Sequence, residues 1–302
     1  MWFWLALIAL LCWSGSDLFS KIGCQGEDDH LAHLKMVIAV GTVMGLHAAY
    51  EIFVGGTEIS FSIILTYLPV SLLYIGSMTL GYMGLRYIEL SVSSPICNSS
   101  GALVALMTLI FLGGEDYSPL AIGAIILVCV GAIGLGVVDA TEDPELRAAR
   151  QEKGNRKYTK SFLALALPVA YCLLDAAGTF ADNRVLETLN EASANCAYEL
   201  TFLAAAVLSF IYVVIIRRDR LVPRMEAPKF LGAICETAGQ FAYIYAIADT
   251  EHLAMSAPII SAYCAASVLW SRLFLKEKLS WKHYLMIALV VIGIVMIGIF
   301  DL

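Results

Sequence analysis

The sequence Ser93-Ser94-Pro95-Ile96 opens an apolar run that ends at Glu115-Asp116-Tyr117-Ser118, and this pattern occurs twice. About 160 residues later, Ser256-Ala257-Pro258-Ile259 opens a second apolar run, which ends at Glu277-Lys278-Leu279-Ser280. Glycines that follow each run also correspond, namely Gly131 and Gly136 in the first copy and Gly293 and Gly298 in the second. Similarity at a fixed separation indicates one structural unit present in two copies.

The composition indicates that both copies lie in a lipid bilayer. The mean hydropathy is +0.78, 60% of the 302 residues are hydrophobic and 15% are charged. Soluble domains carry about 25% charged residues. A soluble fold of this length could not bury so much apolar surface, so the sequence predicts an all-α membrane protein, because helices satisfy every backbone polar group within the segment.

The apolar runs predict ten transmembrane helices, each close to the ~20 residues that cross the hydrocarbon core. Their expected ranges are 2–20, 33–54, 62–85, 92–112, 119–138, 161–180, 195–216, 228–248, 253–274 and 281–300. The first run is long enough to span and lacks a charged n-region, so we expect a helix rather than a cleaved signal.

A polar segment divides these helices five and five. We therefore expect a first repeat at 1–140, a linker at 141–160 and a second repeat at 161–302. Because five is odd, the second repeat enters the membrane from the opposite side. The predicted fold is two inverted five-helix repeats around a central cavity, and such repeats hold the substrate site of many transporters between them.

The basic residues are distributed unevenly between the two faces. Eighteen of the nineteen lysines and arginines fall on the linker side of this topology, and only Arg184 falls on the other. The positive-inside rule then places the linker in the cytoplasm and both termini outside. We expect a multi-pass protein of the plasma (inner) membrane, in contact with lipid and present as a monomer or a homodimer.

The motif Trp13-Ser14-Gly15-Ser16, with Lys21 in the same helix, and the two repeated runs resemble the drug/metabolite transporter (DMT) superfamily in its ten-helix EamA-like branch. The resemblance covers nearly the whole chain. It implies a cavity lined by helices of both repeats, alternating access, and a substrate among amino acids, nucleotide sugars, drugs or other metabolites. Members commonly have cytoplasmic termini, whereas the charges of this chain indicate the reverse.

Acidic residues within the predicted helices are the main substrate signal. Asp17, Glu51, Asp175, Glu199 and Glu236 lie in helices whose central parts contain no lysine or arginine. A charge at a helix centre costs about 2.5–3.5 kcal/mol on insertion scales, so such residues normally face a cavity or a partner. Asp175 and Glu236 are the deepest, and the other three could be interfacial carboxylates.

Polar and aromatic side chains near these acids complete the candidate site. The residues expected to bind substrate or protons are Glu236, Asp175, Asp17, Glu199, Trp13, Tyr82, Tyr171, Gln240 and Tyr243. Asp17 follows Trp13, and Asp175 follows Tyr171, by the same four residues, which repeats the internal duplication. Aromatic rings around a cation contribute about 0.5–2 kcal/mol each. His47, also within a helix, is either a satisfied polar residue or a proton relay.

A cavity with unpaired carboxylates suits a small organic cation of amine or quaternary ammonium type. Phosphates would need lysine or arginine as partners. A buried glutamate that releases its proton when the cation arrives would couple transport to protons. The alternative is a proton-coupled exporter of amino acids or other neutral or zwitterionic metabolites, in which the acids serve protons only.

Other functional classes find less support in the sequence. The P-loop, Gly-x-Ser-x-Gly and His-Glu-x-x-His motifs of enzymes do not occur, although Asp17 and Asp175 could form a catalytic acid pair. A receptor or scaffold would not explain central acids. We expect no catalytic residues, no metal site, no cofactor and no nucleic-acid partner, because no basic tract suggests one.

Overall fold

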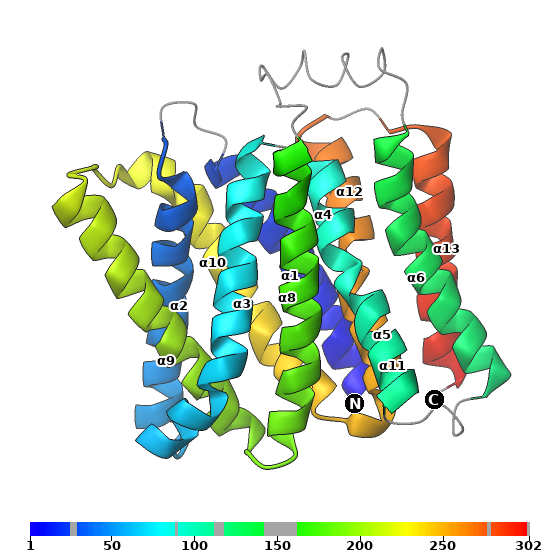
Figure 1. Ribbon diagram of the computed structural model, residues 1–302, viewed down its shortest axis with the longest axis horizontal. Helices are drawn as coiled ribbons and strands as arrows, with labels where there is room; N and C mark the ends of the chain where they lie inside the picture. Colours follow the sequence, from blue (N-terminus) through cyan, green and yellow to red (C-terminus); the bar gives the residue numbers. More distant parts are fainter. Residues whose placement is uncertain (25–28, 88–89, 112–117, 142–161, 277–278, 301–302) are drawn as a thin grey trace.

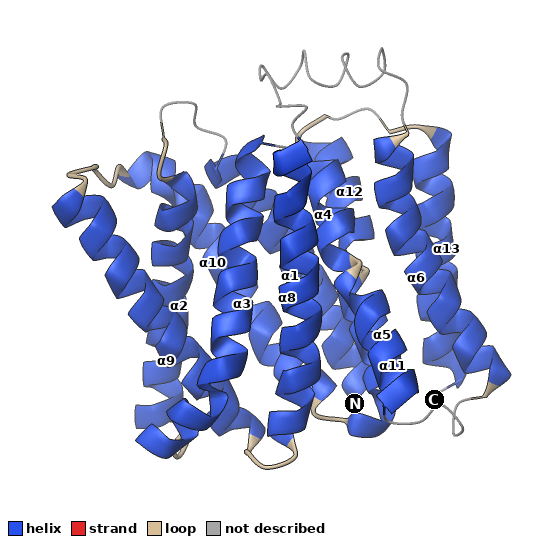
Figure 2. Ribbon diagram, viewed as in Figure 1, coloured by secondary structure: helices blue, strands red, loops and turns tan. Residues whose placement is uncertain are grey.

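A computed structural model describes residues 1–24, 29–87, 90–111, 118–141, 162–276 and 279–300, and helices account for nearly all of them (Figure 2). The predicted linker, apart from Thr141, and the acidic ends of both repeated runs, including Glu115 and Glu277, lie outside the described residues. The α-helices are α1 Trp2–Cys24, α2 Ala32–Phe53, α3 Phe61–Tyr87, α4 Leu90–Asn98, α5 Ser100–Phe111, α6 Pro119–Ala140, α8 Phe162–Leu186, α9 Glu191–Phe210, α10 Pro223–Ile247, α11 Leu253–Ser261, α12 Tyr263–Phe274 and α13 Trp281–Phe300.

These helices form the ten expected segments, and the all-helical membrane fold is confirmed. Helices α4 and α5 together make the fourth segment, and α11 and α12 make the ninth. Helix α9 continues into a π-helical turn, Ile211–Ile216, and the short 3-10 turn Thr250–His252 precedes α11. Among the described residues, seven segments are long and apolar enough by composition to cross a membrane.

The fourth and ninth segments are interrupted at equivalent places. In the fourth, the break at Ser99 comes four residues after Pro95, and in the ninth the break at Ala262 comes four residues after Pro258. The Ser99 and Ala262 amides each donate to the proline carbonyl one turn earlier. Each interruption therefore stands one turn after a proline, at the same place in both halves.

Helix pairing follows a pseudo-two-fold pattern. Helix α1 packs against α10, and the corresponding helices of the other half, α8 and α3, pack against each other. Helices α2 and α9, and likewise α6 and α13, pack against their own counterparts. Figure 1 shows α1 beginning at the lower end of the bundle, whereas α8 begins at the upper end. The two sets of five helices therefore run in opposite directions, as inverted repeats do.

We call the end where α6 finishes and α8 begins the linker end, and the end where α1 begins and α13 finishes the terminal end (Figure 1).

Close helix contacts fix the bundle at its edges. A methyl group at Gly131 would lie 2.8 Å from the Met286 carbonyl oxygen, and one at Gly293 would lie 2.9 Å from that of Ala124. The repeated glycines thus let α6 and α13 approach symmetrically.

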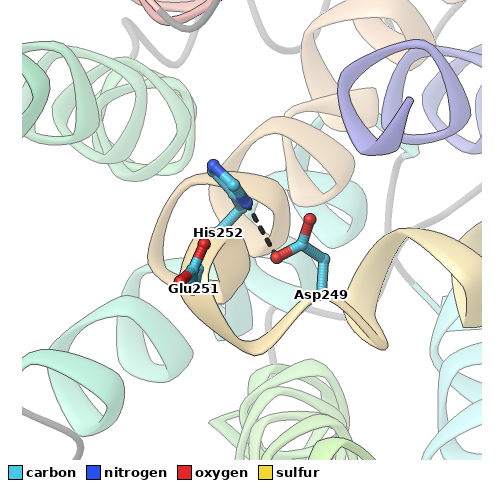
Figure 3. Close-up of side chains that lie close together, drawn as sticks. All are labelled: Asp249, Glu251 and His252. Atoms are coloured by element: carbon cyan, nitrogen blue, oxygen red, sulfur yellow. Dashed lines mark hydrogen bonds and ion pairs between the residues drawn. The ribbon is translucent and has the colours of Figure 1, made fainter.

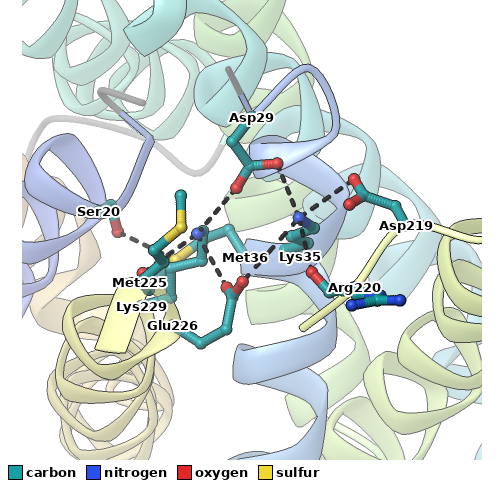
Figure 4. A network of polar contacts seen from close by, with 9 residues as sticks. All are labelled: Ser20, Asp29, Lys35, Met36, Asp219, Arg220, Met225, Glu226 and Lys229. Carbon is teal, nitrogen blue, oxygen red and sulfur yellow. Dashed lines mark hydrogen bonds and ion pairs between the residues drawn. The ribbon is translucent and has the colours of Figure 1, made fainter. Parts of the chain in front are cut away.

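A buried network of charges joins α2 and α10 at the linker end (Figure 4). Lys35 lies 2.9 Å from Asp29 and 3.1 Å from Asp219, and Lys229 lies 2.8 Å from Glu226 and 3.3 Å from Asp29. Both lysines and Asp29 are almost fully buried. Removing one member of such a network leaves an uncompensated buried charge, so the network holds these elements in one arrangement.

Asp29, in the loop before α2, gives this network a pH dependence. Burial alone would raise its pKa, but the hydrogen bonds and charges of Lys35 and Lys229 outweigh burial and hold the pKa below its usual value of 3.8. A lowered pKa in the folded state adds stability above the unfolded pKa, and this stability is lost as the pH falls through the folded value.

We therefore expect the stability advantage of the wild type over Asp29→Asn to be constant near neutral pH. It should shrink toward zero only at acid pH, below about 3.9. Thermal unfolding of both proteins in detergent across this range measures the difference. An advantage that instead grew as the pH fell would contradict the assignment.

Candidate substrate-binding cavity

A cavity of about 920 Å³, including its open mouth, lies between the two halves. Its lining comes from α1, α3, α4, α5, α8, α9, α10, α11 and α12, so both repeats contribute. The two broken segments cross at its wall, where Gly101 of α5 faces Ser261 of α11.

The structure brings eight of the nine expected site residues into this one lining. They are Trp13, Asp17, Tyr82, Tyr171, Asp175, Glu236, Gln240 and Tyr243. Glu199 lies elsewhere, between α2 and α9. The i, i+4 spacing explains part of this convergence, because Asp17 and Trp13 share one face of α1, and Gln240 and Glu236 share one face of α10.

Three carboxylates reach the cavity and are held by hydroxyl groups. Asp17 accepts hydrogen bonds from Ser94 (2.5 Å) and Ser267 (2.8 Å), one from each repeat. Asp175 accepts one from Ser100 at 2.7 Å. Glu236, the third, is partly exposed, as are the other two. All three can therefore meet a molecule in the cavity.

Basic side chains do not compensate these acids within the described part of the chain. No lysine or arginine occurs among the described lining residues. Lys21, one turn beyond Asp17 on α1, is buried, and its ammonium group donates to the Leu85 carbonyl at 3.0 Å. The cavity is therefore acidic, and a positive charge is favoured in it.

Aromatic rings cover much of the remaining wall. The Trp13 ring centroid lies 5.0 Å from that of Tyr243 and 5.9 Å from that of Tyr263, the latter in an edge-on arrangement. Tyr74 packs edge-on against Tyr198 at 5.8 Å. Rings in this number, beside carboxylates, are typical of sites for organic cations.

A hydrogen-bonded polar layer lies on the terminal side of the cavity. The Tyr67 hydroxyl donates to Asp182 at 2.7 Å, and the Tyr74 hydroxyl donates to the same carboxylate at 3.3 Å. Tyr74 also pairs with Tyr243 through a short hydroxyl contact, and Tyr243 donates to Thr179 at 3.1 Å. Tyr67 and Asp182 are fully buried, so the hydrogen bonds of this layer are shielded from solvent.

Asp182 was not predicted as a membrane acid. The hydropathy pattern ends the sixth span at 180, whereas α8 continues to Leu186 and carries Asp182 into the bundle. The seven-residue spacing from Asp175 places both acids on one face of α8, and this spacing is the signal that could have identified it.

Glu199 has a partner of its own. Its two carboxylate oxygens lie 2.8 and 3.0 Å from His47 Nδ1, and Asn195 donates to one of them at 3.0 Å. Glu51 lies near the other ring nitrogen of the same imidazole, 3.9 Å from Nε2. His47 is thus a partnered polar residue that joins α2 to α9, outside the cavity lining.

A second polar cluster lies at the terminal end (Figure 3). Asp249, Glu251 and His252 offer ligand atoms within 4.8 Å of one another, and His252 Nδ1 lies 2.7 Å from Asp249. The imidazole also stacks on Trp2 at 5.0 Å, which fixes the start of α1. The three residues are not part of the cavity lining.

Comparison with known proteins identifies the family. The model of the UAA transporter family matches residues 39–298, which is most of the chain. No curated protein sequence matches. One crystal structure shares 14% sequence identity with a TM-score of 0.64, over 98% of this chain and 96% of the other, and this likeness shows the fold alone.

The family lies within the DMT superfamily that the sequence resembles, and it is a family of transporters rather than enzymes. Transport in the UAA family is of the nucleotide-sugar type. The chain belongs to the UAA transporter family and is a multi-pass membrane transporter of a small molecule.

Proposed function

We propose that the protein carries a small organic cation across the membrane by alternating access, in exchange for protons. The observation that carries this proposal is the set of three cavity carboxylates, Asp17, Asp175 and Glu236, whose described neighbours supply hydroxyl groups and aromatic rings but no positive charge. The substrate then supplies the missing charge.

The same observation argues against a nucleotide sugar as the substrate, although the family is of that type. A diphosphate brings negative charge and is bound by arginine or lysine. Placing it beside three carboxylates would add like-charge repulsion in a medium of low dielectric constant. The chemistry of this lining therefore favours a cation over the usual substrate of the family.

Proton coupling follows from the position of Glu236. It lies near the middle of α10, within the acidic part of the cavity and beside Ser16 of α1. One carboxylate can hold either a proton or the ammonium group of a substrate. Binding of the cation then releases the proton, and return of the proton displaces the cation.

The proposal is tested by a thermal-shift screen followed by flux measurements. Choline, alanine and UDP-N-acetylglucosamine represent a cation, a zwitterion and a nucleotide sugar. A ligand at 100 times its Kd stabilises the folded state by about 2.7 kcal/mol. We expect choline to raise the melting point of the protein. In proteoliposomes, a pH gradient should drive choline transport in the direction opposite to the flow of protons. Stabilisation by the nucleotide sugar alone would contradict the proposal, and stabilisation by alanine alone would favour the zwitterion exporter.

We further infer that the hydrogen-bonded layer around Asp182 is the gate on the terminal side of the cavity, with the linker end cytoplasmic. Access from the terminal end requires α3 to separate from α8, which breaks the contacts of Tyr67 and Tyr74 with Asp182. The linker end carries nearly all the basic residues, which supports the cytoplasmic assignment in a plasma membrane.

Tyr67→Phe should weaken this gate, because it removes one hydroxyl donor from a buried carboxylate. A hydrogen bond to a charged group is worth about 1.5–3 kcal/mol, so the open population should rise about tenfold or more. Hydrogen exchange measures this as faster exchange in residues 61–74 and 179–186. Tyr50→Phe, at an exposed tyrosine of α2, is the matched control. Equal exchange in the two variants would refute the gate.

A further inference from the structure

Three hydrogen-bonding atoms in the cavity wall have no partner among the described residues. They are Trp13 Nε1, Tyr82 Oη and Gln240 Nε2. Tyr82 and Gln240 are 6% and 3% exposed, so these groups are withdrawn from bulk solvent. Buried polar groups in folded proteins are nearly always satisfied, and an exception at the wall of a binding cavity indicates a ligand group that completes the bond.

All three groups can donate a hydrogen bond. The indole nitrogen and the amide nitrogen are donors only, and the phenol hydroxyl is able to donate. The carboxylates in the same cavity are acceptors and suit the positive part of a substrate. The three donors therefore need a different part of the molecule, one that carries acceptor oxygens.

Two of the donors come from helices α1 and α10, which pack against each other. A methyl group at Gly239 would lie 2.7 Å from Trp13 Nε1, so the indole edge packs against α10 at the residue before Gln240. Trp13 is one turn from Asp17, and Gln240 is one turn from Glu236. Because α1 and α10 run in opposite directions, both donors lie on the terminal side of the acids. The donors and the acids are thus separated by about one helical turn, ~5.4 Å.

We propose that the substrate is an organic cation that also carries a neutral acceptor oxygen, such as a carbonyl, ester or hydroxyl group, about one helical turn from its charge. Trp13 and Gln240 receive this oxygen while the carboxylates hold the cation. A carboxylate in that place would be repelled by the acids one turn away. This inference rests on the proposed function and narrows its substrate class.

The test compares three probes that share a trimethylammonium group. Acetylcholine carries an ester, n-pentyltrimethylammonium has the same chain length without oxygen, and glycine betaine carries a carboxylate. We expect acetylcholine to bind the wild type about tenfold more tightly than the pentyl compound, since two neutral hydrogen bonds each contribute several-fold. Glycine betaine should bind more weakly than acetylcholine. Calorimetric titration of the detergent-solubilised full chain measures all three.

Variants assign the preference to the donors. Gln240→Met introduces an apolar side chain of similar length, Trp13→Phe keeps an aromatic ring, and both changes remove the N–H group. Each should cut the ratio of acetylcholine affinity to pentyl-compound affinity to about threefold, whereas Trp4→Phe, at an exposed tryptophan, should keep this ratio intact.

The outcomes separate this inference from the proposed function. Equal affinity of the wild type for acetylcholine and the pentyl compound overturns the acceptor site and leaves cation transport standing. Tightest binding of glycine betaine also overturns it. Failure of every cationic probe to bind overturns both proposals. The wild-type comparison decides even if a variant does not fold.

Discussion

Glu236→Gln is expected to lower proton-coupled uptake of an organic cation by about 100-fold in proteoliposomes. The change keeps the shape and hydrogen-bonding capacity of the side chain but removes the charge. Loss of one partner from a desolvated charge pair costs about 2–5 kcal/mol, of which ~2.7 kcal/mol corresponds to a factor of 100. The same change removes the site at which proton and cation compete, so residual flux should no longer respond to a pH gradient.

Glu58→Gln makes the matched control, since Glu58 is exposed outside the helices and the neutralisation is identical. It should transport like the wild type. Near-normal flux in Glu236→Gln with proton coupling retained would show that the central carboxylate does not carry the exchange. Asp17→Asn and Asp175→Asn, at positions equivalent in the two repeats, should each weaken binding of the cation as well.

Of the substitutions proposed for this protein, Lys229→Met should cause the largest loss in the free energy of unfolding, about 3–5 kcal/mol. The substitution preserves the stem that packs against Gly23 but removes the ammonium group between Asp29 and Glu226. Two carboxylates would then remain buried with one lysine, Lys35, to compensate both. Thermal or denaturant unfolding in detergent measures the loss as a lower melting point or midpoint.

Arg184→Met provides the comparison, because the Arg184–Glu187 pair is 40% and 44% exposed. Exposed ion pairs are worth about 0–1 kcal/mol, so this variant should unfold close to the wild type. Similar losses in the two variants would mean that burial does not determine the strength of the Lys229 contacts.

The sequence predicted those features of the structure that the lipid bilayer constrains. Hydropathy placed ten segments close to the observed helices, because a spanning helix needs a long apolar stretch. The fourth and ninth segments were expected as continuous helices, but each is interrupted one turn after the repeated proline, Pro95 or Pro258. Charge in lipid is costly, so the acids within the predicted helices indicated a cavity, and three of the five, Asp17, Asp175 and Glu236, lie in its lining.

Features that depend on contacts between distant segments were less accessible. In the sequence, Glu199 resembles the other membrane acids. In the structure it contacts His47 between α2 and α9, and no local sequence pattern indicates this contact. The association of Asp29 with Lys229 joins residues 200 positions apart. Asp182 was placed outside the membrane because polar residues near a helix end look the same in hydropathy whether they face water or the bundle.

The central claim, that the cavity carboxylates exchange a proton for a cation, is tested most directly by counting protons released on binding. Acetylcholine is titrated into weakly buffered, detergent-solubilised protein between about pH 5 and pH 9. The account predicts a pH range in which about one proton is released per cation bound, and loss of this release in Glu236→Gln. Saturable binding that releases no proton at any pH in this range, or that releases protons equally in the variant, would contradict it.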